Sequence, residues 1–384
     1  MDDSEHGIVI VGAGPTGLAL GAELKRIGVS SLILDRLAVG ANTSRAAVIH
    51  ARTLEVLEPL GVTAELLKEG IVIPTFRIRD RSRILASVSF ADLHTKYPFT
   101  LMCPQDCTEA ILARRLESLG GVVQRPCEVV EIRPGENEVE VQFKSGGEVR
   151  TMHAQWVVGC DGMHSIVREQ AAIPFLGGAY EESFVLADVE MDWPLGREEV
   201  NLFFSGDGLV VVAPLPGNHF RIVASVTEAP PEPSIADFQQ ILEERGPEKG
   251  AMTIHRMAWS SRFHVQHRIA KSMRQGRVLL AGDAAHVHSP AGGQGMNTGI
   301  QDAIALAGAL KVTLQGNVTA LDAWEEKRLE IAHSVVKMTD RMTKMATASS
   351  SGVKILRNAV VSIIGHIPFA QHALAEKLSE LDNR

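Results

Sequence analysis

A glycine-rich turn near the start of the chain lies between a predicted strand and a predicted helix. Residues 8–11 are an apolar run that predicts a buried strand, and residues 18–27 carry apolar side chains at helical spacing. Residues 32–34 predict a second strand, which ends at Asp35. A strand–helix–strand unit of about thirty residues is typical of a parallel sheet. The turn itself reads Gly-Ala-Gly-Pro-Thr-Gly, residues 12–17.

This spacing of glycines is typical of a dinucleotide-binding loop. Gly12 permits a tight turn, Gly14 lets backbone amides approach a pyrophosphate, and Gly17 lets the helix pack closely on the strand. The helix N-terminus stabilises phosphate charge. Asp35 can accept hydrogen bonds from ribose hydroxyls. The alternative is a purely structural glycine turn, but the strand, helix and carboxylate around it favour a bound dinucleotide.

Two later segments also end a strand at a carboxylate. Residues 157–162 read Val-Val-Gly-Cys-Asp-Gly, and a capped turn in which Asp161 bonds helix amides is the structural alternative there. Residues 278–283 end at Asp283, and a loop with glycines at 292, 293 and 295 follows before the next predicted helix. Exposed amides and a helix dipole favour an anion, or developing negative charge, at that loop.

Composition excludes several classes of protein. With 38 Lys and Arg against 46 Asp and Glu, the net charge is −8, so we expect no nucleic-acid partner. The 45% hydrophobic and 22% charged residues are typical of a globular protein. The four cysteines show no paired-ligand spacing, so we expect no metal site and a reducing, cytoplasmic location. The polar N-terminus does not resemble a secretory signal.

The chain pattern predicts an α/β protein interrupted by antiparallel sheet. Residues 45–70 and 106–119 look helical, strand-like runs separated by turns fill residues 184–226, and the chain is mostly helical after Asp302. The apolar run 359–369 is too short to span a bilayer. We expect it to be a buried helix end, with an interfacial patch as the alternative, and we expect no firm membrane association.

Together these segments resemble the aromatic-hydroxylase family of single-component FAD monooxygenases, which includes 4-hydroxybenzoate and phenol hydroxylases and many polyketide-tailoring oxygenases. Residues 45–57 resemble the segment by which that family approaches the flavin, and residues 103–106 resemble its glutamine-bearing helix start. The similarity runs in patches from residue 7 to about 345. The chain stops before the thioredoxin-like domain of many polyketide-tailoring relatives, and it has no Trp-x-Trp-x-x-Pro segment of a flavin halogenase.

The resemblance implies a Rossmann-type, glutathione-reductase-like FAD-binding domain with an inserted antiparallel-sheet substrate domain and a helical C-terminus. The implied parts are FAD-binding segments 1–74, 101–174 and 271–330, substrate-domain segments 75–100 and 175–270, and C-terminal helices 331–384. No second glycine-rich loop of this kind follows a strand, which indicates that NADH or NADPH visits the flavin transiently.

The resemblance also implies a set of cofactor-binding residues. These are Gly12, Gly14, Pro15, Thr16 and Gly17 at the pyrophosphate, Asp35 and Arg36 at the adenosine ribose, Arg45 at the pyrophosphate or flavin, Gln105 and Asp283 with Gly282 at the ribityl chain, the Val129 backbone at the adenine, Asp161 in a segment associated with FAD and NAD(P)H, and Pro290, Gly293, Gly295, Met296 and Asn297 around the isoalloxazine. His286 and His288 resemble a metal pair, but without further placed ligands they are interpreted as loop-ordering residues.

The implied reaction is hydroxylation of a phenolic or polyketide-like ring by NAD(P)H, O2 and FAD through a flavin hydroperoxide. The cofactor carries the chemistry, so the catalytic residue is unknown, with Arg45 a weak candidate. The substrate is expected near Arg221, His219 or Phe204. Only two tyrosines exist, so the tyrosine relay of 4-hydroxybenzoate hydroxylases is not expected. Oligomeric state is left as monomer or homodimer.

Three other functions stay open at this point. A quinone-pathway hydroxylase would use residues 359–369 at a membrane. An FAD oxidoreductase without oxygen insertion would show no substrate-stimulated oxygen uptake. A non-enzymatic flavin-binding protein would hold FAD but oxidise no NAD(P)H.

Overall fold

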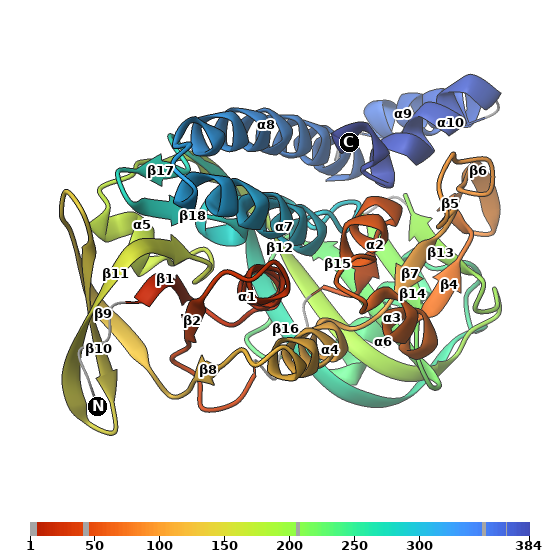
Figure 1. The fold of residues 1–384 in the computed structure, drawn as a ribbon. Helices are drawn as coiled ribbons and strands as arrows, with labels where there is room; N and C mark the ends of the chain where they lie inside the picture. The colour runs from red at the N-terminus through yellow and green to blue at the C-terminus, as the bar shows by residue number, and fades with distance from the viewer. Residues whose placement is uncertain (1–5, 41–45, 205–207, 348–350, 366) are drawn as a thin grey trace.

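The computed structural model describes residues 6–40, 46–204, 208–347, 351–365 and 367–384 (Figure 1). Within them, the first sheet has its strands in the order β17-β18-β11-β1-β2-β8, with β9 and β10 attached to β11 as an antiparallel hairpin. Strands β18, β11, β1, β2 and β8 are parallel to one another. Their bounds are β1 His6–Val11, β2 Ser31–Leu34, β8 Val123–Gln124, β9 Glu128–Pro134, β10 Val139–Ser145, β11 Glu148–Gly159, β17 Arg274–Gln275 and β18 Val278–Leu280.

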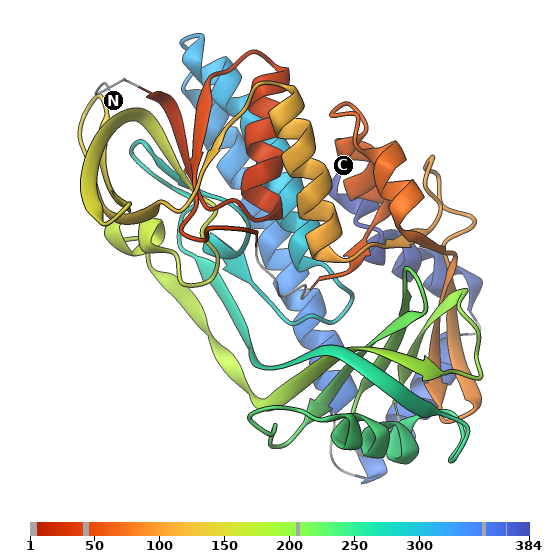
Figure 2. The ribbon, with the colours of Figure 1, turned by 90° about the horizontal axis from the view of Figure 1, so that it is seen from below.

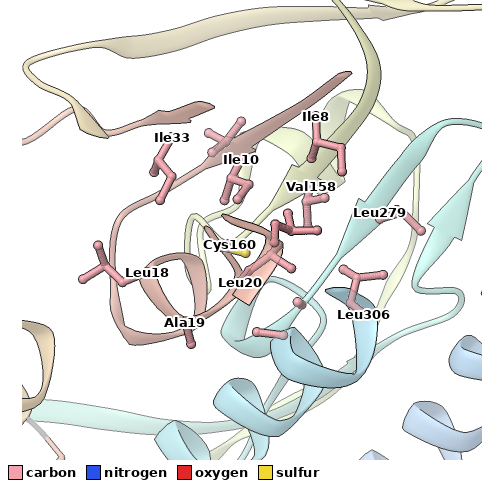
Figure 3. Packing of buried hydrophobic residues seen from close by; sticks show 14 of the residues in the cluster. Ile8, Ile10, Leu18, Ala19, Leu20, Ile33, Val158, Cys160, Leu279 and Leu306 are labelled. Atoms are coloured by element: carbon pink, nitrogen blue, oxygen red, sulfur yellow. The ribbon is translucent and has the colours of Figure 1, made fainter. Parts of the chain in front are cut away.

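Helices cover this parallel sheet and close its core. They are α1 Pro15–Arg26, α4 Gln105–Ser118, α5 Ile166–Gln170, α7 Gly295–Leu314 and α8 Thr319–Thr347. Figure 3 shows Ile8 and Ile10 of β1 among the apolar side chains of this core, which also includes Leu306 of α7. The apolar runs of β1, β2 and β18 are buried, as expected for strands that are covered on both faces and therefore show no alternation.

The second sheet lies beside the first and is mostly antiparallel (Figure 2). Its order is β19-β16-β12-β15-β14-β13-β5-β6, and the pair β13–β5 is parallel. The bounds are β5 Thr75–Asp80, β6 Arg83–Ser89, β12 Phe175–Asp192, β13 Glu199–Phe203, β14 Val210–Leu215, β15 His219–Val226, β16 Thr253–Ala270 and β19 His286–Val287. Helix α6, Ile235–Arg245, packs on one face with its own apolar cluster.

Long strands join the two sheets. β12 and β16 pair over most of their length, and one end of β16 bonds to β19, directly after the first sheet's β18. The remaining elements are β3 Val48–Ile49, β4 Ile71–Ile73, β7 Thr100–Met102, α2 Ala51–Leu57, α3 Thr63–Glu69, α9 Ser351–Ile364, α10 Pro368–Leu378 and the short 3-10 helices η1 Gly282–Ala284 and η2 Leu381–Asn383. Strands β3, β7 and β4 form a small third sheet, of which β7 and β4 lie beside β13 and β14 of the second sheet (Figure 1).

The structure confirms a mixed α/β fold and corrects two local predictions. Residues 45–70 are not one helical stretch, because β3 precedes α2 and Gly61, with φ +81°, separates α2 from α3. The run 359–369 is not a buried helix end, because Ile363 is 66% exposed and Phe369 is 82% exposed. Among the described residues, no helix is both long enough and apolar enough to cross a bilayer.

Candidate cofactor-binding site

The 12–17 loop connects β1 to α1 and packs against the end of β11. Gly12 has φ +102°, and a side-chain carbon there would lie 2.4 Å from the Cys160 carbonyl oxygen. A side-chain carbon at Gly17 would lie 2.0 Å from the Gly12 carbonyl oxygen. Gly14 differs, because no atom lies within 4 Å of the position where its side chain would stand. The loop is therefore tightly packed behind and open at Gly14, where α1 begins.

Asp35 lies directly against this loop at the end of β2. Its Oδ2 accepts a hydrogen bond from the Ala13 amide at 2.6 Å, and its Oδ1 accepts one from the Leu37 amide at 2.8 Å. Arg125 also reaches the loop, since its Nη2 donates to the Ala13 carbonyl at 3.2 Å. The Nε of Arg125 is buried and has no hydrogen-bond partner in the described part of the chain. This cation was not predicted from the sequence, and it suits a phosphate at the loop.

Gln105 begins α4 and joins two segments of the site. Its Oε1 accepts from the Ala46 amide at 3.3 Å, and its Nε2 donates to Glu109 at 2.8 Å. Burial raises the pKa of the Glu109 carboxyl. Val129 lies on β9, close in sequence to Cys127, whose amide donates to the Asp35 carbonyl at 2.7 Å. Arg45 lies outside the described residues, and Arg36 is exposed.

The segment after β11 is tied to the segment after β18. Asp161 Oδ2 accepts from the Val167 amide at 3.3 Å, so the capped turn is present, and Asp161 Oδ1 is buried without a partner in the described part of the chain. Burial raises the pKa of Asp161. Arg168 donates to the Met163 carbonyl and to the Ala284 carbonyl, each at 2.9 Å. These contacts hold two strand ends next to each other.

The turn that carries Asp283 is fixed from beneath by α7. Asp302 Oδ2 accepts from the Gly282 amide at 3.1 Å and pairs with His286 Nε2 at 2.6 Å, while its Oδ1 accepts from Arg328 at 2.5 Å. Burial would raise the pKa of Asp302, but Arg328 and His286 outweigh it and lower that pKa. Asp283 itself is exposed. His286 is therefore a hydrogen-bond partner of Asp302, and no group of potential metal ligands occurs among the described residues.

Thr16 links the first and third segments directly. A side-chain carbon at Gly282 would lie 2.6 Å from Thr16 Oγ1, and one at Gly299 would lie 2.5 Å from the same atom. Both positions therefore require glycine for close approach of α1 and α7. Gly299 was not predicted as a site residue, although a glycine one turn into a buried helix is a sequence feature that could have indicated close packing.

Asn297 organises the 290–297 loop. Its side-chain amide donates to the Val48 and Gly293 carbonyls, each at 2.8 Å, and its Oδ1 accepts from the His50 amide at 2.8 Å. Gly293 has φ +66°, and a side-chain carbon there would lie 2.7 Å from Val48 Cβ. Gly295 and Met296 form the first turn of α7, while Pro290 is exposed at the start of the loop.

Two histidines, the buried His50 and the half-buried His288, line this loop and carry no charge at neutral pH. Burial lowers the pKa of His50 and of His288 to about 4. His50 Nε2–H donates to the Gly292 carbonyl at 2.7 Å, and His288 Nδ1–H donates to the Ser289 carbonyl at 3.0 Å. The N-terminus of α7 is thus bordered by neutral side chains, so its dipole is the main electrostatic feature there.

These features fit a dinucleotide with a tricyclic ring. Two helix N-termini, at Pro15 and Gly295, follow loops, and the close approach of Thr16 to Gly299 brings α1 and α7 together. Gly14 leaves open space above the first of them, and Arg125 offers a cation next to it. Such helix ends bind phosphate or other anionic groups without further charged residues.

One face of the second sheet is called the wall here, and it consists of two neighbouring rows of residues on β12–β16. Ala213, Arg221, Asp188 and Trp259 stand opposite one another on β14, β15, β12 and β16, so they share one face. Arg221 forms two 2.8 Å hydrogen bonds to Asp188, and Trp259 Nε1 donates to the same carboxylate at 2.8 Å. The next row is apolar and contains Leu202, Val211 and Val223.

Val48 joins this wall to the loop. It packs in the same apolar cluster as Leu202 and Val211, and it also contacts Asn297 through its carbonyl. The other two positions suggested by the sequence lie apart from the Arg221 row. His219 pairs with Glu190 at 3.3 Å, and Phe204 is buried beneath the guanidinium of Arg357, 5.0 Å from its ring centroid.

Comparisons with known proteins agree with this geometry. A family model described as an FAD binding domain matches residues 5–339. An uncharacterized aromatic compound monooxygenase, YhjG of Bacillus subtilis, is 33% identical over 98% of this chain and 75% of its own length. The 6-methylpretetramide 4-monooxygenase of Streptomyces rimosus is 35% identical over 93% of this chain, which spans 63% of that relative.

A solved structure of a relative has a similar three-dimensional fold. The anhydrotetracycline hydroxylase OxyS of Streptomyces rimosus superposes with a TM-score of 0.84 at 31% identity, covering 99% of this chain and 76% of that one. The family model covers well over half of the sequence, and its description names FAD as the cofactor. The chain therefore belongs to the FAD-dependent aromatic hydroxylases, a family of flavoprotein monooxygenases.

Proposed function

We propose that this protein hydroxylates an uncharged phenolic or polyketide-like aromatic ring with O2 and NADH or NADPH. One oxygen atom enters the ring as a hydroxyl, the other leaves as water, and the nicotinamide nucleotide supplies the two electrons. FAD, when bound, supplies the redox chemistry. The names of two relatives, a 6-methylpretetramide 4-monooxygenase and an anhydrotetracycline hydroxylase, support a polycyclic aromatic substrate class.

In this proposal the first sheet is a Rossmann-type domain interrupted by the second sheet. Gly14 and the α1 N-terminus, with Arg125, would hold the FAD pyrophosphate, and Asp35 would hold the adenosine ribose. The full set also includes Gly12, Pro15, Thr16, Gly17, Arg36, Arg45, Gln105, Val129, Asp161, Gly282 and Asp283. The flavin ring would lie at the 290–297 loop, with Gly293, Gly295, Met296 and Asn297 around it and Pro290 at its edge.

The observation that carries the substrate class is the position of Val48. It packs against the same buried apolar cluster as Leu202 and Val211 of the wall, and it contacts the 290–297 loop through Gly293 and Asn297. A ring bound between loop and wall would therefore meet aliphatic side chains. Arg221, in the adjacent row of the wall, is ion-paired with Asp188, so this row presents a compensated charge to a carboxylate.

The residues of this chain act by binding, orientation and exclusion of water. An enclosed apolar surface protects reactive oxygen species from water and aligns the ring carbon that reacts. Neutral His50 and His288 keep positive charge away from the loop, so the α7 dipole is available to negative charge on the bound ring.

Reconstituted protein tests the proposal. Purified chain loaded with FAD is mixed with NADH or NADPH and a panel of neutral phenols and polycyclic aromatics, and products are analysed by mass spectrometry. We expect NAD(P)H oxidation that a subset of ligands stimulates, with a product one oxygen atom heavier. Oxidation that no ligand stimulates, or stimulation with only hydrogen peroxide as product, would contradict hydroxylation while leaving FAD binding intact.

A further inference from the structure

The C-terminal tail, residues 375–384, is bonded to the 290–297 loop. The side-chain amide of Gln294 donates to the Leu378 carbonyl at 3.1 Å and to the Gly292 carbonyl at 3.0 Å. The Arg52 amide donates to the Ser379 carbonyl at 3.2 Å. The tail thus contacts the loop and the first turn of α2 together, although Gln294 and Leu378 are 84 positions apart in the chain.

Apolar packing reinforces these bonds. Gly292 has φ +84°, and a side-chain carbon there would lie 3.2 Å from Leu378 Cδ2. Leu378 and Leu381 are buried in the same cluster as Ala47, which precedes Val48. The shape of residues 292–294 therefore depends on a tail that stays docked.

Glu380 is the residue that fixes the tail to α7. Its side chain is buried, with the residue only 1% exposed, and its backbone has φ +58°, a conformation that non-glycine residues seldom adopt. Glu380 Oε1 accepts from Thr298 Oγ1 at 3.1 Å, and its Oε2 accepts from the side-chain amide of Gln301. Gln301 also donates to Thr53 Oγ1 on α2 at 3.0 Å. Thr298 and Gln301 lie in the first two turns of α7, directly after the loop.

We propose that Glu380 is a positioning residue of the flavin site, whose buried carboxyl docks the tail on α7 so that the tail holds residues 292–294 in the shape that receives the flavin ring. This inference rests on the proposed function, since the 290–297 loop is taken to be the flavin-binding loop. Glu380 itself touches neither cofactor nor substrate and acts through Gln294, Thr298 and the loop backbone.

The charges around Glu380 indicate how docking depends on pH. The charged side chains that act on it are Asp302 on α7 and Arg328 on α8, which are paired with each other, while α2 contributes the neutral Thr53 through Gln301. Burial raises the pKa of Glu380 to about 8, against the opposing effects of Thr298, Arg328 and Gln301. The docked tail therefore keeps a proton that a released, solvated tail would lose.

The sign follows from this difference in proton binding. An exposed glutamate titrates at about 4.3, so between that pH and about 8 the docked state holds one more proton than the released state. Docking accordingly weakens by up to about tenfold for each pH unit in this window and then becomes constant. FAD affinity should follow docking and decrease as the pH rises toward 8.

The test compares Glu380→Gln, Glu380→Ala and the control Glu376→Gln, an exposed glutamate on α10. Apoprotein of each is titrated with FAD from pH 5.5 to 9, with flavin fluorescence giving the Kd and the visible flavin spectrum giving the ring environment. We expect the Kd of wild type and Glu376→Gln to rise with pH, Glu380→Gln to show a pH-independent Kd near the wild-type acid value, and Glu380→Ala to bind FAD about tenfold more weakly throughout.

Several outcomes would overturn the inference. A Kd of Glu380→Gln that rises with pH as in wild type would exclude a role for this carboxyl, as would wild-type affinity in both variants. If Glu380→Ala does not fold, the Gln variant alone decides, because it keeps the shape and the two hydrogen-bond partners. Wild type that binds no FAD at any pH would overturn the proposed function together with this inference, whereas wild type that binds FAD with no change in the variants overturns only the latter.

Discussion

Asn297 and His50 are 247 positions apart in the chain, and their 2.8 Å hydrogen bond ties the first turn of α7 to the start of α2. The same asparagine donates to Val48 and Gly293, so one side chain satisfies three backbone groups from two segments. A buried amide with all these partners fixes a unique loop shape, because every alternative leaves a polar group unpaired. The 290–297 loop is therefore set by a long-range contact and not by its glycines alone.

Replacement of Asn297 by alanine should weaken FAD binding. The variant leaves the His50 amide and two carbonyls without partners, at a cost of about 1–3 kcal/mol for the unsatisfied groups. We expect a lower Tm and a rise of about tenfold or more in the FAD Kd, measured by fluorescence titration. Asn137→Ala, at an exposed turn, is the control and should change neither. An unchanged FAD Kd in Asn297→Ala would show that the loop does not depend on this tie.

Substitutions at Gly12 and Gly14 of the 12–17 loop should separate an effect on folding from an effect on FAD binding. Gly14→Val adds a side chain where the structure has open space and a negative φ, so the apoprotein should keep its Tm but lose FAD. Gly12→Val adds atoms within 2.4 Å of the Cys160 carbonyl and forces a positive φ, so it should prevent folding. Thermal melts and FAD titrations of both variants decide, and stoichiometric yellow holoprotein from Gly14→Val would contradict the placement of the pyrophosphate.

Much of the site could be predicted because its parts are local patterns. A strand that stops at glycine and carboxylate before a helix is recognisable wherever it occurs, and parallel strands bring such ends to one edge of a sheet. Gly12, Asp161 and Asp283 were found this way. The structure places their segments in contact through Thr16 and Arg168.

The supporting residues could not be predicted, because their partners are distant in sequence. Asp302 resembles a surface residue until α8 brings Arg328 against it. Polar side chains at 298, 301 and 302 have the helical spacing of one face, which is the only local indication that a polar network lies there. The bounds of strand β16 were not predicted, because apolar and polar residues alternate only weakly along it. Its pairing with β12 stabilises it as a strand instead.

The pH dependence of the unfolding free energy should show that His50 is buried as a neutral group. Its pKa is about 4 in the folded protein and about 6.5 when unfolded, so the unfolded chain binds the extra proton in between. Stability is therefore lost as the pH falls from about 6.5 to about 4, by roughly 3 kcal/mol for this group over the whole window. Urea unfolding at several pH values should show a shallower loss for His50→Gln than for wild type. The exposed His94→Gln should keep the wild-type slope, and an equal slope in His50→Gln would refute its burial as a neutral group.

The ion pair of Arg221 and Asp188 should behave as a buried unit. Asp188→Asn leaves the guanidinium buried without its counter-charge, and we expect a loss of about 3–5 kcal/mol in unfolding free energy. The double variant Asp188→Leu with Arg221→Met removes both charges and should recover most of that loss. Arg133 and Glu131 make a two-bond pair of similar geometry on the surface, so Glu131→Gln should cost under about 1 kcal/mol. Urea unfolding of the single and double variants measures the coupling energy between Arg221 and Asp188. A double variant no more stable than Asp188→Asn would contradict the prediction that the two residues act as a buried unit.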